Sequence, residues 1–102
     1  MEPCDLAKSA VIDGRTQPNR LSVDGSVLVN RDADEVLVAE AVPQGINPTI
    51  LLLEVSVKET IGPMKGVCKP FMFTKEVDGR QYTSVEIRYV DERDSVGVSY
   101  IE

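Results

Sequence analysis

The sequence predicts an all-β protein with one domain, residues 1–102, built as an antiparallel β-sandwich of about six to seven strands. Apolar residues, many of them β-branched, gather in short runs where they alternate with polar residues, as on a half-buried strand. Turn-forming pairs separate these runs; they are Asp13-Gly14, Asp24-Gly25, Gly62-Pro63 and Asp78-Gly79. The composition, with 42% hydrophobic and 27% charged residues, suits a chain that buries one modest core.

The pattern is clearest in the C-terminal third. Residues 82–90 should pair antiparallel with residues 95–101 across the loop 91–94, with Tyr89 opposite Val96. This register places apolar side chains on one face; they are Val85, Ile87, Tyr89, Val96, Val98 and Tyr100. Residues 71–77 should add a strand through the loop 78–80, with Phe71 opposite Ile87. We therefore expect a three-stranded meander over residues 71–101, in a sandwich of the immunoglobulin-like or a similar type.

The first half of the chain permits alternatives. Residues 21–29 read as one long strand with Gly25 at a bend, or as a tight hairpin at Asp24-Gly25. In residues 33–42, Asp32 followed by Glu35 resembles a helix capping box, but the valines alternate as in a strand. We predict a strand there. Residues 5–10 allow a short helical turn.

Residues 49–58 predict a strand whose two faces differ. Leu51, Leu53, Val55 and Val57 share one apolar face, whereas the other face is apolar only at Ile50 and Leu52 and then becomes polar. The outer face of a sandwich is normally in contact with water, so these two residues need a cover. The flanking segments 42–47 and 61–66 are the expected cover, and a partner is the alternative.

The charge and the residue types of the chain disfavour several classes of function. The chain carries 17 acidic and 11 basic residues and a formal net charge of −6, and its basic residues are scattered, which disfavours nucleic-acid binding. The absence of histidine removes the Ser-His-Asp and Cys-His mechanisms. No run of about 18 apolar residues is present, so no membrane span is expected. We expect no enzyme activity and no cofactor.

Cys4 and Cys68 are the two cysteines. A disulfide between them would close a long loop and add about 4 kcal/mol of stability; two reduced thiols are the alternative. The N-terminus lacks the features of a signal peptide, so the chain is either cytoplasmic or a mature fragment. The small β-rich fold slightly favours a secreted or periplasmic location.

Two acidic loops suggest a weak cation site. Asn30, Asp32 and Asp34 have the alternate spacing with which calcium loops begin, but Glu35 stands where the turn glycine belongs. Residue 41, the twelfth position, is alanine rather than a bidentate acid. A small-ligand or cation-binding domain that uses loops 30–35 and 91–94 is therefore the alternative function.

The loop 60–66 suggests a different role. It carries Ile61, Pro63 and Met64 close to two glycines, Gly62 and Gly66, and apolar side chains in such a loop can enter a partner's pocket. Together with Ile50 and Leu52, these residues form the predicted partner-binding set. The sequence thus favours a non-catalytic protein-interaction module, of an accessory, adhesion or inhibitor-like kind, that binds a protein partner or self-associates.

Overall fold

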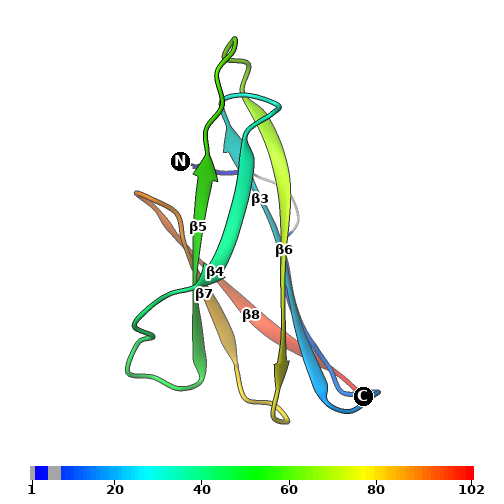
Figure 1. Cartoon of the computed structure of the whole chain (residues 1–102). Coiled ribbons are helices and arrows are strands. Elements are labelled where there is room, and N and C mark those ends of the chain that lie inside the picture. Colours follow the sequence, from blue (N-terminus) through cyan, green and yellow to red (C-terminus); the bar gives the residue numbers. More distant parts are fainter. Residues whose placement is uncertain (1, 5–7) are drawn as a thin grey trace.

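The computed structural model describes residues 2–4 and 8–102 and confirms the all-β class, with 58% of the chain in strands. No helix occurs in the described residues, and none could therefore cross a membrane. The strands are β1 (Glu2–Pro3), β2 (Ser9–Asp13), β3 (Asn19–Val29), β4 (Glu35–Glu40), β5 (Ile50–Lys58), β6 (Val67–Val77), β7 (Ser84–Arg88) and β8 (Arg93–Ile101) (Figure 1).

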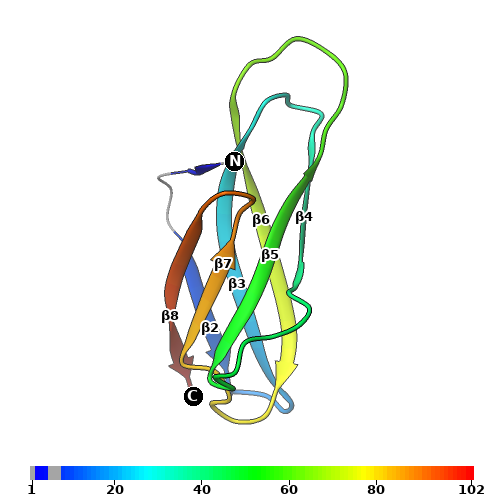
Figure 2. The same cartoon turned by 90° about the vertical axis from the view of Figure 1, so that its left-hand side faces the viewer.

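The strands form one mixed sheet that is nearly barrel-shaped. Its order is β6, β3, then β1 and β2, then β8, β7, β5 and β4. The prediction of a purely antiparallel arrangement is wrong, because β2 pairs parallel with β8 and β5 pairs parallel with β7. The parallel pair of β5 and β7 arises because the strand between them in sequence, β6, crosses over and pairs with β3 instead of β5. β7 therefore runs in the same direction as β5 (Figure 2).

Side chains bridge the two end strands of the sheet, β4 and β6. Lys75 Nζ lies 2.7 Å from Glu40 Oε1 and donates to the Tyr82 hydroxyl at 3.1 Å. Lys69 Nζ donates to the main-chain oxygen of Asp34 at 2.9 Å. The hydrogen bond to Glu40 raises the pKa of Lys75 above its ordinary value. These lysines close the gap between the end strands without main-chain pairing, and edge lysines also discourage a foreign strand.

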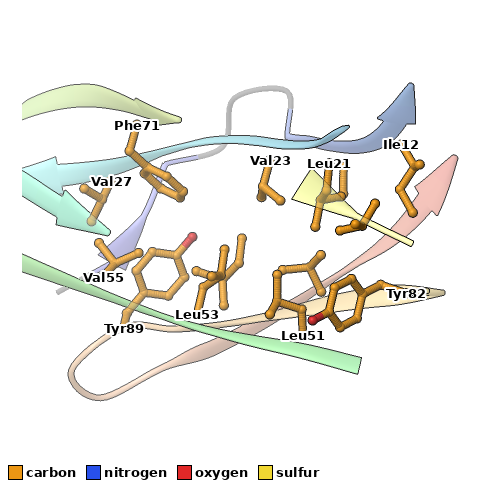
Figure 3. Close-up of a cluster of buried hydrophobic side chains, with 14 of the residues drawn as sticks. Ile12, Leu21, Val23, Val27, Leu51, Leu53, Val55, Phe71, Tyr82 and Tyr89 are labelled. Atoms are coloured by element: carbon orange, nitrogen blue, oxygen red, sulfur yellow. The ribbon is translucent and has the colours of Figure 1, made fainter. Parts of the chain in front are cut away.

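The core lies between two facing layers of this sheet (Figure 3). The first layer supplies Ile12, Leu21, Val23, Val27 and Phe71, and the second supplies Leu51, Leu53, Val55, Val85, Ile87 and Tyr89. β3 is the single long strand, and burial alternates along it except at Ser26, which is buried on the outer face. Gly25 faces the Phe71 ring, where a Cβ atom would lie 2.6 Å from Phe71 Cζ. Glycine is therefore required at this close approach.

The other predicted strands of the first half are also present. Residues 33–42 contain β4, a strand and not a helix, and residues 49–58 contain β5. The helical turn suggested for residues 5–10 falls partly on residues 5–7, which lie outside the described residues, while Ser9 and Ala10 belong to β2.

The predicted meander over residues 71–101 is wrong in its first half. β6 pairs along its whole length with β3, setting Phe71 opposite Gly25 and Phe73 opposite Val23, and does not pair with β7. Face parity correctly indicated that Phe71 points into the core. It could not identify the neighbouring strand, because any strand with the same inward spacing satisfies it.

The hairpin of β7 and β8 is confirmed, but its register differs from the prediction. Val96 pairs with Val85 rather than with Tyr89, and Ile87 pairs with Asp94. The turn covers residues 89–92, where Tyr89 N donates to Glu92 O at 2.8 Å. The shift is an even number of residues, so the inward face remains as predicted.

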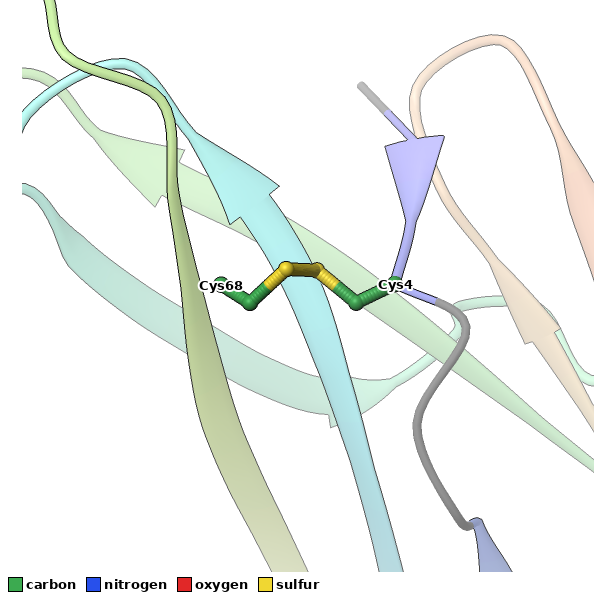
Figure 4. The surroundings of a disulfide bond; sticks show 2 residues. All are labelled: Cys4 and Cys68. Atoms are coloured by element: carbon green, nitrogen blue, oxygen red, sulfur yellow. A yellow bond between two sulfur atoms is a disulfide. The ribbon is translucent and has the colours of Figure 1, made fainter.

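Cys4 and Cys68 form a disulfide, with 6.1 Å between their Cα atoms. The bond passes across the outer face of β3 and joins the segment after β1 to β6, which lie on opposite sides of that strand (Figure 4). Cys4 N donates to Ser26 O at 3.1 Å. Ser26 is buried on the same face of β3, and no residue that the structure describes forms a hydrogen bond with its hydroxyl.

Candidate functional site

Two loops meet at one end of the sheet, and we call them the tip loops: residues 30–34, between β3 and β4, and residues 59–66, between β5 and β6 (Figures 1 and 2). The sequence suggested a cation site in the first loop and a partner-binding site in the second. The structure places them side by side, joined by hydrogen bonds. They therefore form a single site.

Asp34 holds the beginning of the loop 59–66, at Thr60. Its Oδ1 accepts hydrogen bonds from Thr60 N at 2.9 Å and from Thr60 Oγ1 at 2.7 Å. Its Oδ2 accepts from Arg31 N at 3.0 Å. The Asp34 side chain is buried, and the hydrogen bonds from Thr60 lower its pKa below the ordinary value of 3.8. The carboxylate therefore stays ionised and holds both loops.

Asn30 and Arg31 hold the middle and the end of the same loop. Lys65 N donates to Asn30 O at 2.7 Å, and Gly66 N donates to the same oxygen at 3.3 Å. Arg31 Nε donates to Gly62 O at 2.8 Å. Gly66 has a φ of 59°, a left-handed conformation that glycine adopts without strain, so the sequence permits this turn. The loop 59–66 is therefore fixed along its length rather than hanging free.

The apolar side chains of this loop point into solvent. Ile61 is 103% exposed and Met64 is 67% exposed, and Pro63 between them is exposed as well. They do not fold back on Ile50 and Leu52, as one reading of the sequence expected. The tip loops thus present an apolar surface on a hydrogen-bonded base.

Ile50 and Leu52 lie elsewhere, and the chain itself covers Leu52, which is 5% exposed. The cover is the segment 42–47. Gln44 Oε1 accepts from Leu52 N at 2.9 Å, and Gln44 Nε2 donates to Leu52 O at 2.9 Å, so this side chain acts like a neighbouring strand. Ile50 is half-buried. The structure therefore separates these two residues from Ile61, Pro63 and Met64.

The segment 42–47 also presents apolar residues that sequence reasoning did not select. Val42 is exposed and Ile46 is 105% exposed, at the opposite end of the sheet from the tip loops. The sequence signal was available, because the segment 42–47 contains Pro43 and Gly45 just as the loop 60–66 contains glycine and proline. Among the described residues, no hydrogen bond holds the main chain of Ile46. The main chain beside Ile61, by contrast, is held by hydrogen bonds at Thr60 and Gly62.

The acidic loops show no cation-binding geometry in the part of the chain that the structure describes. No group of three or more Cys, Asp or Glu residues there could hold a metal ion. Asp34 is engaged as described, Asp32 is exposed, and Asp94 forms an ion pair with Lys8. Cation binding through Asn30, Asp32 and Asp34, or through loop 91–94, stays a prediction that a calcium titration of the melting temperature would test.

Comparisons of the chain with protein families, with curated proteins and with solved structures find no match in any of the three.

Proposed function

We propose that this chain is a non-catalytic protein-interaction module that contacts another protein through its tip loops. One observation carries the proposal: Ile61 is fully exposed on a loop that hydrogen bonds to Asn30, Arg31 and Asp34 hold in place. A loop main chain already held in position loses little further entropy when a partner covers it, and burying the Ile61 side chain then contributes its full apolar area.

The residue types and the architecture support the same role. Without histidine, the chain lacks the commonest acid–base group and the usual activating base of serine and cysteine nucleophiles, whereas loops on a rigid β scaffold are common binding elements. We further propose that the two facing layers act as an immunoglobulin-like sandwich does, presenting its end loops. Accessory, adhesion and inhibitor-like proteins are the classes that use such a surface.

The disulfide favours an oxidising compartment. Cys4–Cys68 joins the N-terminal segment to β6, and structural disulfides persist chiefly outside the cytoplasm. We therefore propose that the protein works as a secreted or periplasmic module.

The test compares two exposed isoleucines at opposite ends of the molecule. A photoreactive amino acid is placed at position 61 or, as the matched control, at position 46, and each variant is irradiated in an extract of the source cells. We expect an adduct with another protein from position 61 and none from position 46. Adducts from position 46 alone, or equal adducts from both, would contradict the proposal.

A second variant separates binding from folding. Ile61→Asp places a charge in the proposed contact, yet the side chain touches solvent in the free protein, so the free energy of unfolding should change by less than about 0.5 kcal/mol. Binding should weaken at least about tenfold, since an unpaired carboxylate would be buried in the complex. Ile46→Asp should change neither quantity.

A further inference from the structure

β5 continues past the end of its neighbour β7, which leaves part of its edge open. The last pair between these strands is Glu54 with Arg88, after which the chain turns through residues 89–92 and begins β8. β5 runs on to Lys58, paired on its other side with β4 (Figure 2). Along Val55–Lys58, no strand among the described residues occupies the side where β7 has ended.

The main-chain groups on this edge can be assigned from the pairing. Alternate residues of a strand direct their N–H and C=O groups to opposite sides. Leu52 O accepts from Ala41 N on the β4 side, so the even-numbered residues of β5 pair with β4. Val55 and Val57 therefore direct their main-chain groups to the other side. Val57, beyond the last β7 pair, presents a donor and an acceptor to the open edge.

A cleft accompanies the open edge on both faces of the sheet. On the outer face a hollow of about 780 Å³ lies between β4 and β5 and the turn 89–92. On the inner face a second hollow, of about 370 Å³, lies between β5 and the end of β3. Ser56 and Val90 line both hollows, and Val29 and Val57 line the inner one. An added strand would thus find apolar side chains beside it and space on either face.

Acidic side chains outnumber basic ones around the cleft. Arg88 and Arg93 are both held by Glu86, whose carboxylate oxygens lie 3.4 Å and 3.8 Å from them. Glu54, Glu59 and Glu92 also line the two hollows, and none of them forms an ion pair with a described residue. The rim is therefore acidic, which favours a basic partner segment.

We infer that the open edge of β5 receives an extended, basic segment of a partner protein, which adds as a strand. Its main chain pairs with Val57, its apolar side chains at alternate positions pack near Val29 and Val90, and its lysine or arginine side chains approach Glu54 and Glu92. The inference goes beyond the proposed function, because it uses neither Ile61 nor Met64.

The experiment uses the full chain, labelled with nitrogen-15, and short peptides. The first peptide, about seven residues long, alternates lysine and valine; the control alternates glutamate and valine. We expect the lysine peptide to slow hydrogen exchange of the Val57 amide and to bind more tightly than the glutamate peptide, with an affinity that falls as salt is added.

Matched variants locate the peptide. Glu54→Gln combined with Glu92→Gln should weaken binding of the lysine peptide about fivefold, whereas Asp24→Asn, on the outer face of β3, should not change it. Ile61→Asp should also leave it unchanged, so the failure of this inference and the failure of the tip-loop proposal can be told apart.

Two outcomes would overturn the inference. The first is a Val57 amide whose exchange no peptide slows. The second is a Val57 amide that becomes protected in the protein alone as its concentration rises, because the strand on this edge would then come from a second copy of the chain.

Discussion

Asp34 shows how a single buried carboxylate can organise a surface. It accepts hydrogen bonds from Thr60 in one tip loop and from Arg31 in the other, so its charge is satisfied within the protein. Buried charges persist only when they are paired or fully hydrogen-bonded. An acidic motif that resembles the start of a calcium loop therefore serves, in this fold, to join two loops.

The titration of Asp34 should control the tip loops. Its folded-state pKa lies below the ordinary value of 3.8, so the stabilisation is complete above that value and is lost as the pH falls through the folded pKa. We expect the amide of Thr60 to keep its chemical shift and its protection from about pH 7 to pH 5, and to lose both in stronger acid. Nuclear magnetic resonance titration measures this.

Asp34→Asn is the control, because its amide group offers a donor where Thr60 and Arg31 also donate. This variant should show a poorly protected Thr60 amide at every pH. Loss of protection between pH 7 and pH 5 in the native chain would show that another group holds the loop.

The stability of the core depends on the close contact between Gly25 and the Phe71 ring. Gly25→Ala would place a Cβ atom 2.6 Å from the Phe71 ring, so the ring must move within a packed core. We expect a loss of about 1–3 kcal/mol in the free energy of unfolding, measured with urea. Combining it with Phe71→Leu should recover part of that loss, because the two substitutions share one volume.

Gly97→Ala is the matched control, since among the described residues no heavy atom beyond its chain neighbours lies within 4 Å of the position its Cβ would take. An equal loss at both glycines would mean that chain entropy or β-strand preference, rather than the Phe71 contact, sets the cost.

At the scale of the elements, the segment 42–47 explains how β5 has an apolar outer end without a strand to cover it. β4 ends at Glu40, and Ala41 N still donates to Leu52 O. The Gln44 side chain completes this pairing, because it accepts from Leu52 N and donates a second hydrogen bond to Leu52 O. A side-chain amide can do this because it carries both a donor and an acceptor. The element therefore extends the sheet beyond its last strand.

Gln44→Ala removes both side-chain hydrogen bonds to Leu52 and should cost about 1–3 kcal/mol in urea unfolding, since Leu52 N loses its acceptor while Leu52 O keeps the bond from Ala41 N. Exchange of the Leu52 amide should accelerate. Gln81→Ala, in an exposed turn where the side chain accepts one bond from Asp78, should change stability by less than about 0.5 kcal/mol. If the two variants behave alike, the segment 42–47 is not held by Gln44.

At the scale of the whole molecule, the disulfide and the lysine bridges hold together a sheet that does not close completely. Cys4–Cys68 ties the N-terminal segment to β6, and Lys75 with Glu40 links β6 to β4. A small domain gains much of its stability from such long-range links, because its core is modest.

Replacing both cysteines by serine should lower the free energy of unfolding by about 4 kcal/mol, since the unfolded chain regains the entropy of a 64-residue loop. Urea unfolding of the double variant measures this, and the native chain with a reductant should give the same result. An unchanged midpoint under reducing conditions would show that the native protein is stable without the bond.

The sequence by itself predicted β5, β7, β8 and the strand form of β4, with their inward faces, because alternation of apolar side chains is a local property of each segment. It left β3 open between one long strand and a hairpin, and it did not predict β2. It also gave the candidates Ile61, Pro63 and Met64, whose glycines and proline mark a loop. Only the tertiary structure decided which strands are neighbours, because Phe71 satisfies the same parity against β7 as against β3. The hydrogen bond from Thr60 to Asp34 likewise joins residues that no local pattern connects. Only the packing of the whole chain therefore showed that the tip loops lie side by side.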